Sequence, residues 1–206
     1  MGNKGVVMAK STLAILSVAL LTSPVVFAAC DTSNIPGYYV DRYTDNQNGT
    51  ITDNMTNLMW MKCEVDIPWD NQNKICFHDT QLQGSDATRQ KFTWQEALAE
   101  AQSANNTAFA GKSNWRLPNI KELSSILALH CLSTSNFTAL NTRYFDGSAS
   151  FYWSSTPDVN EVETLGDDLP VNKAWMVSFK NAVGIGAGTS GISEELNVRL
   201  VRDVTP

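Results

Sequence analysis

The sequence predicts an α+β domain in which two helices in the middle of the chain are flanked by short strands. Capping boxes predict the two helices, because Thr93 and Asn119 are good capping residues and each is followed three positions later by Glu, at Glu96 and Glu122. The segments on either side are rich in aromatic and β-branched residues and are bounded by turn residues, as strands are. Strands grouped around helices favour an α+β arrangement over alternating βαβ units.

Residues 1–28 are predicted to be a secretory signal peptide. Lys4 and Lys10 supply positive charge, residues 13–27 are mostly apolar, and Val26-Phe27-Ala28 offers small residues to a signal peptidase. The apolar stretch is too short for a comfortable membrane span. Cleavage would leave one domain, residues 29–206, which we expect in the periplasm, at the cell surface or in the medium, without a transmembrane span.

The charge of the chain argues against two classes of partner. Removing the signal takes away two of the 15 basic residues and none of the 21 acidic ones, which leaves a net charge of −8. Nucleic acids and anionic membranes both bind proteins through Lys and Arg, so an acidic domain is a poor candidate for either. We interpret the charge as an aid to solubility.

Residues 38–53 predict a β-hairpin at the start of the domain. Asn48-Gly49 can supply the positive φ angles of a tight turn. The Asp and Asn residues of this segment do not have the spacing of an EF-hand calcium loop, since Thr44 and Met55 would occupy its first and last positions. A strand over residues 58–62 is expected next, with a buried Trp60.

Four cysteines in an oxidising compartment predict two disulfides. Cys63 and Cys76 flank a short polar segment and are expected to close it as a loop, which pairs Cys30 with Cys131 among the three connectivities. The alternative is lipidation of Cys30, because residues 28–30 resemble the end of a lipobox. Disulfides are favoured, since Phe27 fits a lipobox poorly and acylation would leave an odd thiol.

The second half of the chain is expected to combine short strands with loops. The helix that begins after Asn119 is expected to run to His130. The acidic segment 157–172 and the Gly-containing segment 184–191 are expected to be loops. They would connect three strands, predicted over residues 151–155, 174–179 and 197–202.

Trp-centred motifs occur along the chain in a fixed order. They are Arg42-Tyr43-Thr44-Asp45 with Asn48-Gly49-Thr50, Leu58-Met59-Trp60, Thr93-Trp94-Gln95-Glu96-Ala97, Trp115-Arg116-Leu117-Pro118-Asn119, Tyr152-Trp153-Ser154-Ser155 and Val198-Arg199-Leu200-Val201-Arg202. The series resembles the Lcl C-terminal domain family over residues 40–203. The resemblance implies a C-type lectin-like fold, with two helices packed on a small twisted antiparallel sheet, long loops and stabilising disulfides, and it supports the Cys63–Cys76 pairing.

The resemblance also implies a secreted or cell-surface binding module. The adhesin after which the family is named has sulfated polysaccharide as its implied ligand class, which requires clustered Lys and Arg. This domain is acidic, and after Arg143 its only basic residues are Lys173, Lys180, Arg199 and Arg202. The sugar-binding calcium motif of C-type lectins has only a weak counterpart in Thr156-Pro157-Asp158, so the resemblance supports the fold more than the ligand.

Candidate ligand-binding residues come from two segments. Trp69 lies between the two close cysteines, whereas the other Trp residues of the domain lie in regular motifs and are expected in the core. The acidic segment and the lysine that follows it are a second candidate surface, whose carboxylates could bind calcium. Its candidate residues are Asp158, Glu161, Glu163, Asp167, Asp168 and Lys173. Arg116 is expected in a structural ion pair.

The sequence favours a non-catalytic binding module, an adhesin-like protein that recognises a glycan or another surface ligand. It contains no Gly-x-Ser-x-Gly, His-Glu-x-x-His or phosphate-binding Gly loop. An alternative is a structural subunit of an envelope or appendage assembly, with protein partners or further copies of itself. An oxidase of the formylglycine-generating type is disfavoured, because such enzymes use a cysteine pair late in the chain and no cysteine follows Cys131.

Overall fold

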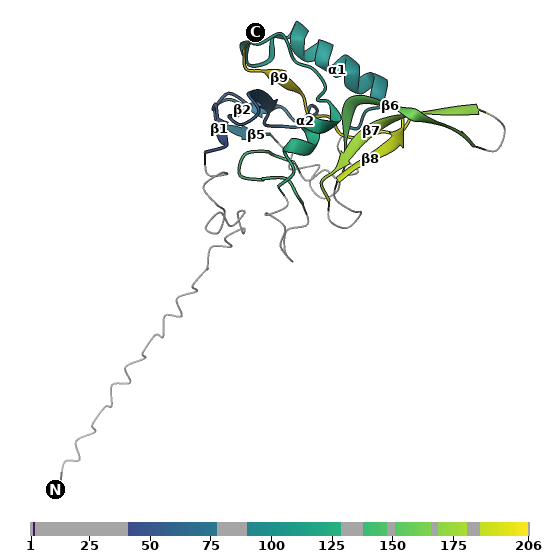
Figure 1. Ribbon diagram of the computed structural model, residues 1–206. Helices are drawn as coiled ribbons and strands as arrows, with labels where there is room; N and C mark the ends of the chain where they lie inside the picture. The colour runs from purple at the N-terminus through teal and green to yellow at the C-terminus, as the bar shows by residue number, and fades with distance from the viewer. Residues whose placement is uncertain are drawn as a thin grey trace.

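The computed structural model describes residues 2, 41–77, 90–128, 138–147, 151–165, 169–180 and 186–205 (Figure 1). Apart from Gly2, the predicted signal peptide lies outside the described residues, as do Cys30 and Cys131. The predicted cleavage and the second disulfide therefore stay predictions. Among the helices that are described, none is long and apolar enough to cross a membrane.

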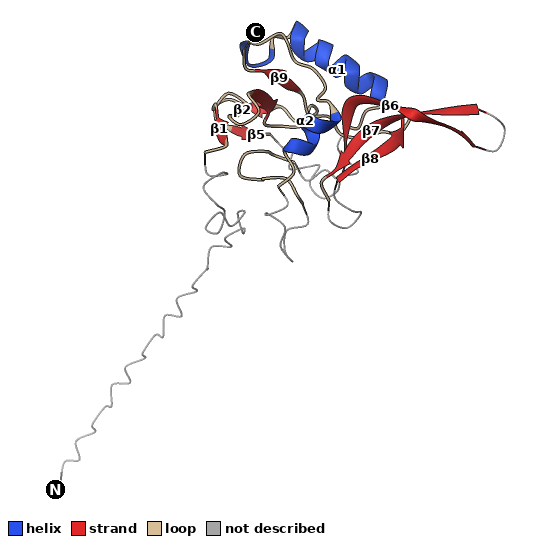
Figure 2. Ribbon diagram, viewed as in Figure 1, coloured by secondary structure: helices blue, strands red, loops and turns tan. Residues whose placement is uncertain are grey.

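A four-stranded antiparallel sheet joins the beginning and the end of the domain (Figure 2). Its strands, in spatial order, are β1 (Tyr43–Asp45), β2 (Thr50–Asp53), β3 (Leu58–Met61) and β9 (Val201–Asp203). Trp60 of β3 lies opposite Ile51 on one neighbour and Val201 on the other, and all three side chains are fully buried. The strand that was predicted around Trp60 is therefore confirmed.

The predicted hairpin at the start of the domain is confirmed, with a wider turn than expected. β1 and β2 pair antiparallel, and Asp45 lies opposite Ile51. The positive φ angles are those of Gln47 (58°) and Gly49 (85°) rather than of Asn48 and Gly49. The turn is wider because the Asn46 N–H donates to the Thr50 carbonyl (3.0 Å), which closes the connection over four residues.

A disulfide-linked hairpin follows β3. It is formed by β4 (Trp69–Asp70) and β5 (Ile75–Cys76), and Trp69 lies opposite Cys76. Cys76 is bonded to Cys63, as predicted from the polar segment between them. The segment is thus a stapled hairpin on the surface of the domain rather than an irregular loop.

Both predicted helices are present with their capping boxes. They are α1 (Trp94–Asn106) and α2 (Ile120–Ser125), and a short 3₁₀ segment η3 (Phe109–Gly111) lies between them. In each box the capping side chain accepts from the third backbone N–H, and the Glu side chain accepts from the capping residue's N–H. These bonds satisfy donors that a helix start otherwise leaves unpaired, so the local sequence defined both helix starts.

The second helix is shorter than expected and does not run to His130. It ends at Ser125, whose carbonyl accepts from the Arg42 guanidinium (2.7 Å). The next backbone groups pair elsewhere, since Leu127 bridges Leu140 and the Ala128 N–H donates to the Ala139 carbonyl (2.6 Å). Tertiary pairing therefore replaces helix continuation at this point.

The segments 157–172 and 184–191, which were predicted to be loops, belong largely to a three-stranded antiparallel sheet. Its strands, in spatial order, are β6 (Phe151–Leu165), β7 (Leu169–Ser178) and β8 (Gly186–Gly191). Most of the acidic segment 157–172 belongs to β6 and β7, which extend past β8 as a two-stranded arm (Figure 1). Most of segment 184–191 forms β8, which pairs with β7 from Lys173 to Ser178. Backbone pairing across the sheet outweighs the polar and Gly-rich composition of these segments.

The core consists of two buried clusters. One cluster joins α2 to both sheets and contains Trp60, Leu123 and Val177. The other joins α1 to the sheets and contains Ala97, Trp115 and Trp153. The predicted burial is confirmed for these three Trp residues, whereas Trp94 and Trp175 are half-buried. The chain is thus an α+β domain, as predicted.

Candidate functional site

The predicted binding residues lie on two surfaces at different sides of the domain. Trp69 is on the hairpin of β4 and β5, near β1 and β2, whereas the acidic arm of β6 and β7 projects from the opposite side (Figure 1). The structure therefore does not bring Trp69 together with Asp158 or Lys173. Each surface is a separate candidate.

Trp69 is half-buried and packs against the turn between β1 and β2. A Cβ atom on Gly49 would lie 2.8 Å from Trp69 Cγ and 3.2 Å from the Phe109 ring, so the indole contacts the Gly49 backbone closely. The Cys63–Cys76 disulfide fixes the strand opposite Trp69. The indole is therefore a rigid wall of the surface rather than an open platform.

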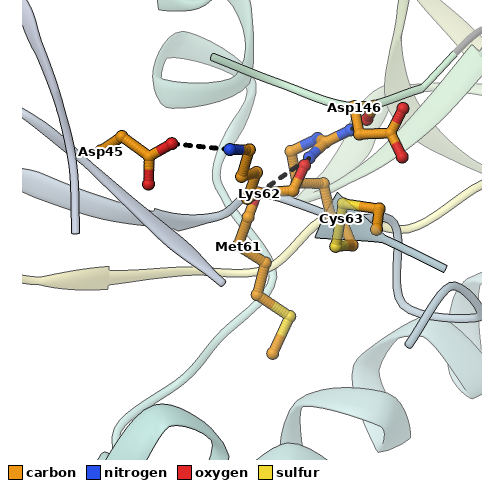
Figure 3. The surroundings of a disulfide bond; sticks show 7 residues. Asp45, Met61, Lys62, Cys63 and Asp146 are labelled. Atoms are coloured by element: carbon orange, nitrogen blue, oxygen red, sulfur yellow. Dashed lines mark hydrogen bonds and ion pairs between the residues drawn. A yellow bond between two sulfur atoms is a disulfide. The ribbon is translucent and has the colours of Figure 1, made fainter. Parts of the chain in front are cut away.

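An ion pair lies beside the Trp69 ring. Lys62 Nζ is 2.6 Å from Asp45 Oδ2 and 5.4 Å from the centroid of the Trp69 ring. The exposed fractions of the Lys62 and Asp45 side chains are 17 % and 21 %, so both are reached by solvent. Figure 3 shows the Lys62 side chain extending towards Asp45, with the disulfide of Cys63 beside it. The pair brings one donor and one acceptor of opposite charge next to the indole.

The backbone around Lys62 is held in place by buried groups. The Lys62 N–H donates to the Gly49 carbonyl (2.9 Å), which ties the turn to the end of β3. Arg199, which is 1 % exposed, donates to the carbonyls of Met61, Lys62 and Asp146. The position of Lys62 is thus set by the core.

Next to Arg199, the Tyr152 hydroxyl donates to the carboxylate of Glu64 (2.6 Å). Both side chains are buried. Burial, with the charge of Glu64 as a further cause, holds the pKa of Tyr152 well above its ordinary value. Glu64 directly follows Cys63, so this buried hydrogen bond joins the start of the stapled hairpin to β6.

Amides and hydroxyls of the turn complete this surface. Asn46 donates to the hydroxyls of Thr50 (3.0 Å) and Thr52 (2.9 Å), and the Thr50 hydroxyl donates to Asn48 Oδ1 (2.6 Å). The side chains of Gln47 and Asn48 are exposed. We call Asp45, Lys62, Trp69 and the turn residues 46–50 the Trp69 surface.

The tip of the stapled hairpin is stabilised by Asp70. Its carboxylate accepts from the backbone and side-chain N–H groups of Asn73 and from the backbone of Gln72. The hydrogen bonds from Asn73 lower the pKa of Asp70 below its ordinary value. Asp70 therefore stays ionised and keeps the turn between β4 and β5 closed.

The acidic arm distributes its candidate residues along two strands. Asp158 of β6 lies opposite Lys173 of β7, and both are half-buried. Glu161 and Glu163 lie in β6, and Asp167 and Asp168 lie outside the described residues. No group of three or more His, Cys, Asp or Glu in the described part of the chain could hold a metal ion.

Sequence reasoning identified Trp69 but missed the groups around it. In the sequence, Asp45 belongs to the Arg42-Tyr43-Thr44-Asp45 motif and to the segment whose spacing fails the calcium-loop pattern, and no motif marks Lys62 as a binding residue. The two are 17 positions apart, and the sheet of β1, β2 and β3 brings them together. The one available signal was the cluster of Asp and Asn next to Gly49 in the predicted hairpin.

The predicted ion pair of Arg116 is confirmed as a structural feature. Its guanidinium donates two hydrogen bonds to Glu122 (2.7 and 2.9 Å), and a third contact reaches Asp203 (3.4 Å). The bonds to Glu122 raise the pKa of Arg116. The pair fixes the start of α2 to the end of β9.

Comparison with known proteins identifies one family. The model of the Lcl C-terminal domain matches residues 49–202, about three quarters of the chain. A match over this extent indicates an extracellular or cell-surface protein. Curated proteins provide no match.

Proposed function

The chain belongs to the Lcl C-terminal domain family, and we propose that it is a non-catalytic, adhesin-like module that binds a glycan through the Trp69 surface. The observation that carries the proposal is the half-buried Trp69 indole beside the Lys62–Asp45 ion pair. Sugars present apolar C–H faces together with hydroxyls, so they suit a surface that combines an aromatic wall with charged and amide groups.

The rigidity of the Trp69 surface supports this function. The hairpin that carries Trp69 is linked to the core by the Cys63–Cys76 disulfide, and the backbone of Lys62 is held by Arg199. A surface that is already ordered loses little conformational entropy when a ligand binds. Exposed surfaces that are rigid are therefore favoured for recognition of weakly binding sugars.

A non-catalytic role is part of the proposal. The sequence contains no Gly-x-Ser-x-Gly, His-Glu-x-x-His or phosphate-binding Gly loop, and the described cysteines form a disulfide. An oxidase of the formylglycine-generating type would need a reactive cysteine pair, so we expect a thiol titration of the unfolded, unreduced protein to detect no free thiol. Two reactive thiols in that titration would revive the oxidase alternative.

A glycan array tests the proposed function. The exported, oxidised protein is applied with calcium and, separately, with a chelator, and we expect binding that does not require calcium. Trp69→Ala is expected to lose most of the binding, since truncation of a central aromatic residue costs roughly fivefold or more in affinity. Ile75→Ala is the matched control, because Ile75 lies on the same hairpin but on its opposite, exposed face.

The array has two outcomes that contradict the proposal. Binding that survives in Trp69→Ala but is lost with the chelator would move the site to carboxylates such as those of the arm. Silence of the wild-type protein on every glycan would exclude glycan binding. Thermal melts of both variants show whether a loss of binding reflects a loss of folding.

The arm of β6 and β7 supports a second candidate function, the docking of a protein partner in an envelope or appendage assembly. β6 is an edge strand, and Val159 on it has an exposed fraction of 84 %. Unpaired strand edges are templates for pairing with another chain. Residues 157–173 contain five acids and one lysine, Lys173, a net charge of −4 that disfavours pairing with a second copy.

The oligomeric state, measured by light scattering, tests the second candidate function. We expect the isolated protein to be monomeric at micromolar concentration, because like charges on two arms repel. A stable homo-oligomer that Val159→Lys dissociates would establish self-assembly through the arm and contradict this expectation. A monomer that binds a basic envelope protein, and loses it in Val159→Lys, would support docking.

A further inference from the structure

We infer that the Trp69 surface takes a neutral glycan and discriminates against sulfated and other polyanionic glycans. The inference rests on the proposed function, since it specifies the ligand class of the same site. It follows from the way in which the one cation of the Trp69 surface and four of the five described arginines are already engaged by protein groups.

The only cation of the Trp69 surface is compensated within the surface itself. Lys62 Nζ lies 2.6 Å from Asp45 Oδ2, in a pair whose members are about four-fifths buried. A sulfate that approached the ammonium would also approach the carboxylate, so attraction and repulsion would largely cancel. To bind the sulfate strongly, Lys62 would have to give up Asp45 and leave its charge half-buried without a partner.

The arginines of the described residues supply few of the missing cations. Sulfates are bound best by guanidinium groups that present their paired N–H donors to solvent. Four of the five arginines use these donors on groups of the protein, and the fifth, Arg143, is exposed and lies over the Tyr144 ring. Their partners are Asp53 for Arg42, Glu122 for Arg116, backbone carbonyls for Arg199 and Asn114 for Arg202.

The same groups suit the hydroxyls of a neutral sugar. The Asp45 carboxylate can accept from a sugar hydroxyl, and the Lys62 ammonium can donate to another, while the ion pair stays in place. The exposed amides of Gln47 and Asn48 lie in the adjacent turn and offer both donors and acceptors. Since the pair has no net charge, binding is expected to depend weakly on salt.

Asp45→Asn tests the inference, because it removes the carboxylate that neutralises Lys62. Asp41→Asn is the matched control, since it changes the net charge by the same amount at an exposed residue just before β1. Binding of each protein is measured to heparin, to desulfated heparin and to the neutral glycan that gives the strongest array signal. Thermal melts confirm that each variant is folded.

We expect the wild-type protein and Asp41→Asn to prefer the neutral glycan over heparin. Asp45→Asn is expected to gain heparin binding by about tenfold at low salt and to lose this gain at high salt. Wild-type protein that binds heparin more tightly than desulfated heparin would overturn the inference while leaving the proposed function intact. A neutral preference without any gain in Asp45→Asn would overturn the role assigned to the ion pair, and no glycan binding at all would overturn the proposed function as well.

Discussion

Replacement of Gly49 by alanine tests whether the Trp69 indole packs against the turn between β1 and β2. Gly49 has a φ of 85°, and an added Cβ would lie 2.8 Å from Trp69 Cγ and 3.2 Å from the Phe109 ring. Two costs are expected. A left-handed φ costs an L-residue roughly 1–2 kcal/mol, and forcing a methyl group into a packed contact costs roughly 1–3 kcal/mol. The free energy of unfolding of Gly49→Ala should therefore fall by roughly 2–5 kcal/mol.

Gly111→Ala is the control that separates the two costs. Gly111 has a similar φ of 72°, but nothing lies within 4 Å of the position its Cβ would occupy. Its substitution should cost only the backbone part, about 1–2 kcal/mol. The assay is urea unfolding followed by circular dichroism, with ligand binding measured on the folded variants. We expect Gly49→Ala to displace the indole and weaken binding, and Gly111→Ala to leave binding unchanged. Equal losses of stability in the two variants would refute the packing of Trp69 on Gly49.

Two further predictions concern the groups beneath the Trp69 surface. Tyr152 keeps its proton above about pH 10, where an unfolded tyrosine loses it, so the free energy of unfolding should fall as the pH rises beyond that value. Tyr152→Phe should flatten this pH dependence and lower the free energy of unfolding by roughly 1–3 kcal/mol at neutral pH, because Glu64 loses a buried donor. Urea unfolding at pH 7 and pH 10.5 measures both effects. A pH dependence that is the same in Tyr152→Phe as in the wild-type protein would contradict the role assigned to Tyr152. The disulfide joins residues 13 positions apart, so Cys63→Ser with Cys76→Ser should lower the free energy of unfolding by about 3 kcal/mol, and no change in urea unfolding would argue against a constraining role.

The helix starts were predictable because they depend on residues close together in the sequence. Each capping box uses a cap and a Glu only three positions apart, Thr93 with Glu96 and Asn119 with Glu122, and both form as expected. The end of α2 was not predictable in this way. The Ser125 carbonyl is bound by Arg42, which is 83 positions away in the sequence.

The arm was mistaken for a loop because its strands depend on pairing rather than on composition. Asp158 pairs with Lys173 and Glu163 with Val171, so both halves of the segment satisfy each other's backbone groups. The Gly-containing strand β8 is a similar case. Gly188 lies opposite Met176, and its missing side chain leaves room for the Met176 side chain. The low strand propensity of glycine does not reveal such a packing requirement.

The candidate site was predicted in part. The position of Trp69 between Cys63 and Cys76 indicated a stapled surface segment, and the disulfide confirms this. The ion pair of Lys62 with Asp45 follows from the register of three strands, and no local motif encodes such a register. The acidic composition of residues 157–172 instead favoured the arm as a candidate binding surface.

An NMR titration of the tryptophan indole N–H signals with the neutral oligosaccharide that binds best on the array tests directly whether a glycan binds at Trp69. The signal of Trp69 is assigned by comparison with Trp69→Phe, and the buried Trp60 and Trp153 serve as internal references. If a glycan binds at Trp69, we expect a saturable shift of the Trp69 signal, with little change in the two references. Saturable binding that leaves the Trp69 signal unmoved would contradict this expectation and place the glycan site elsewhere on the domain.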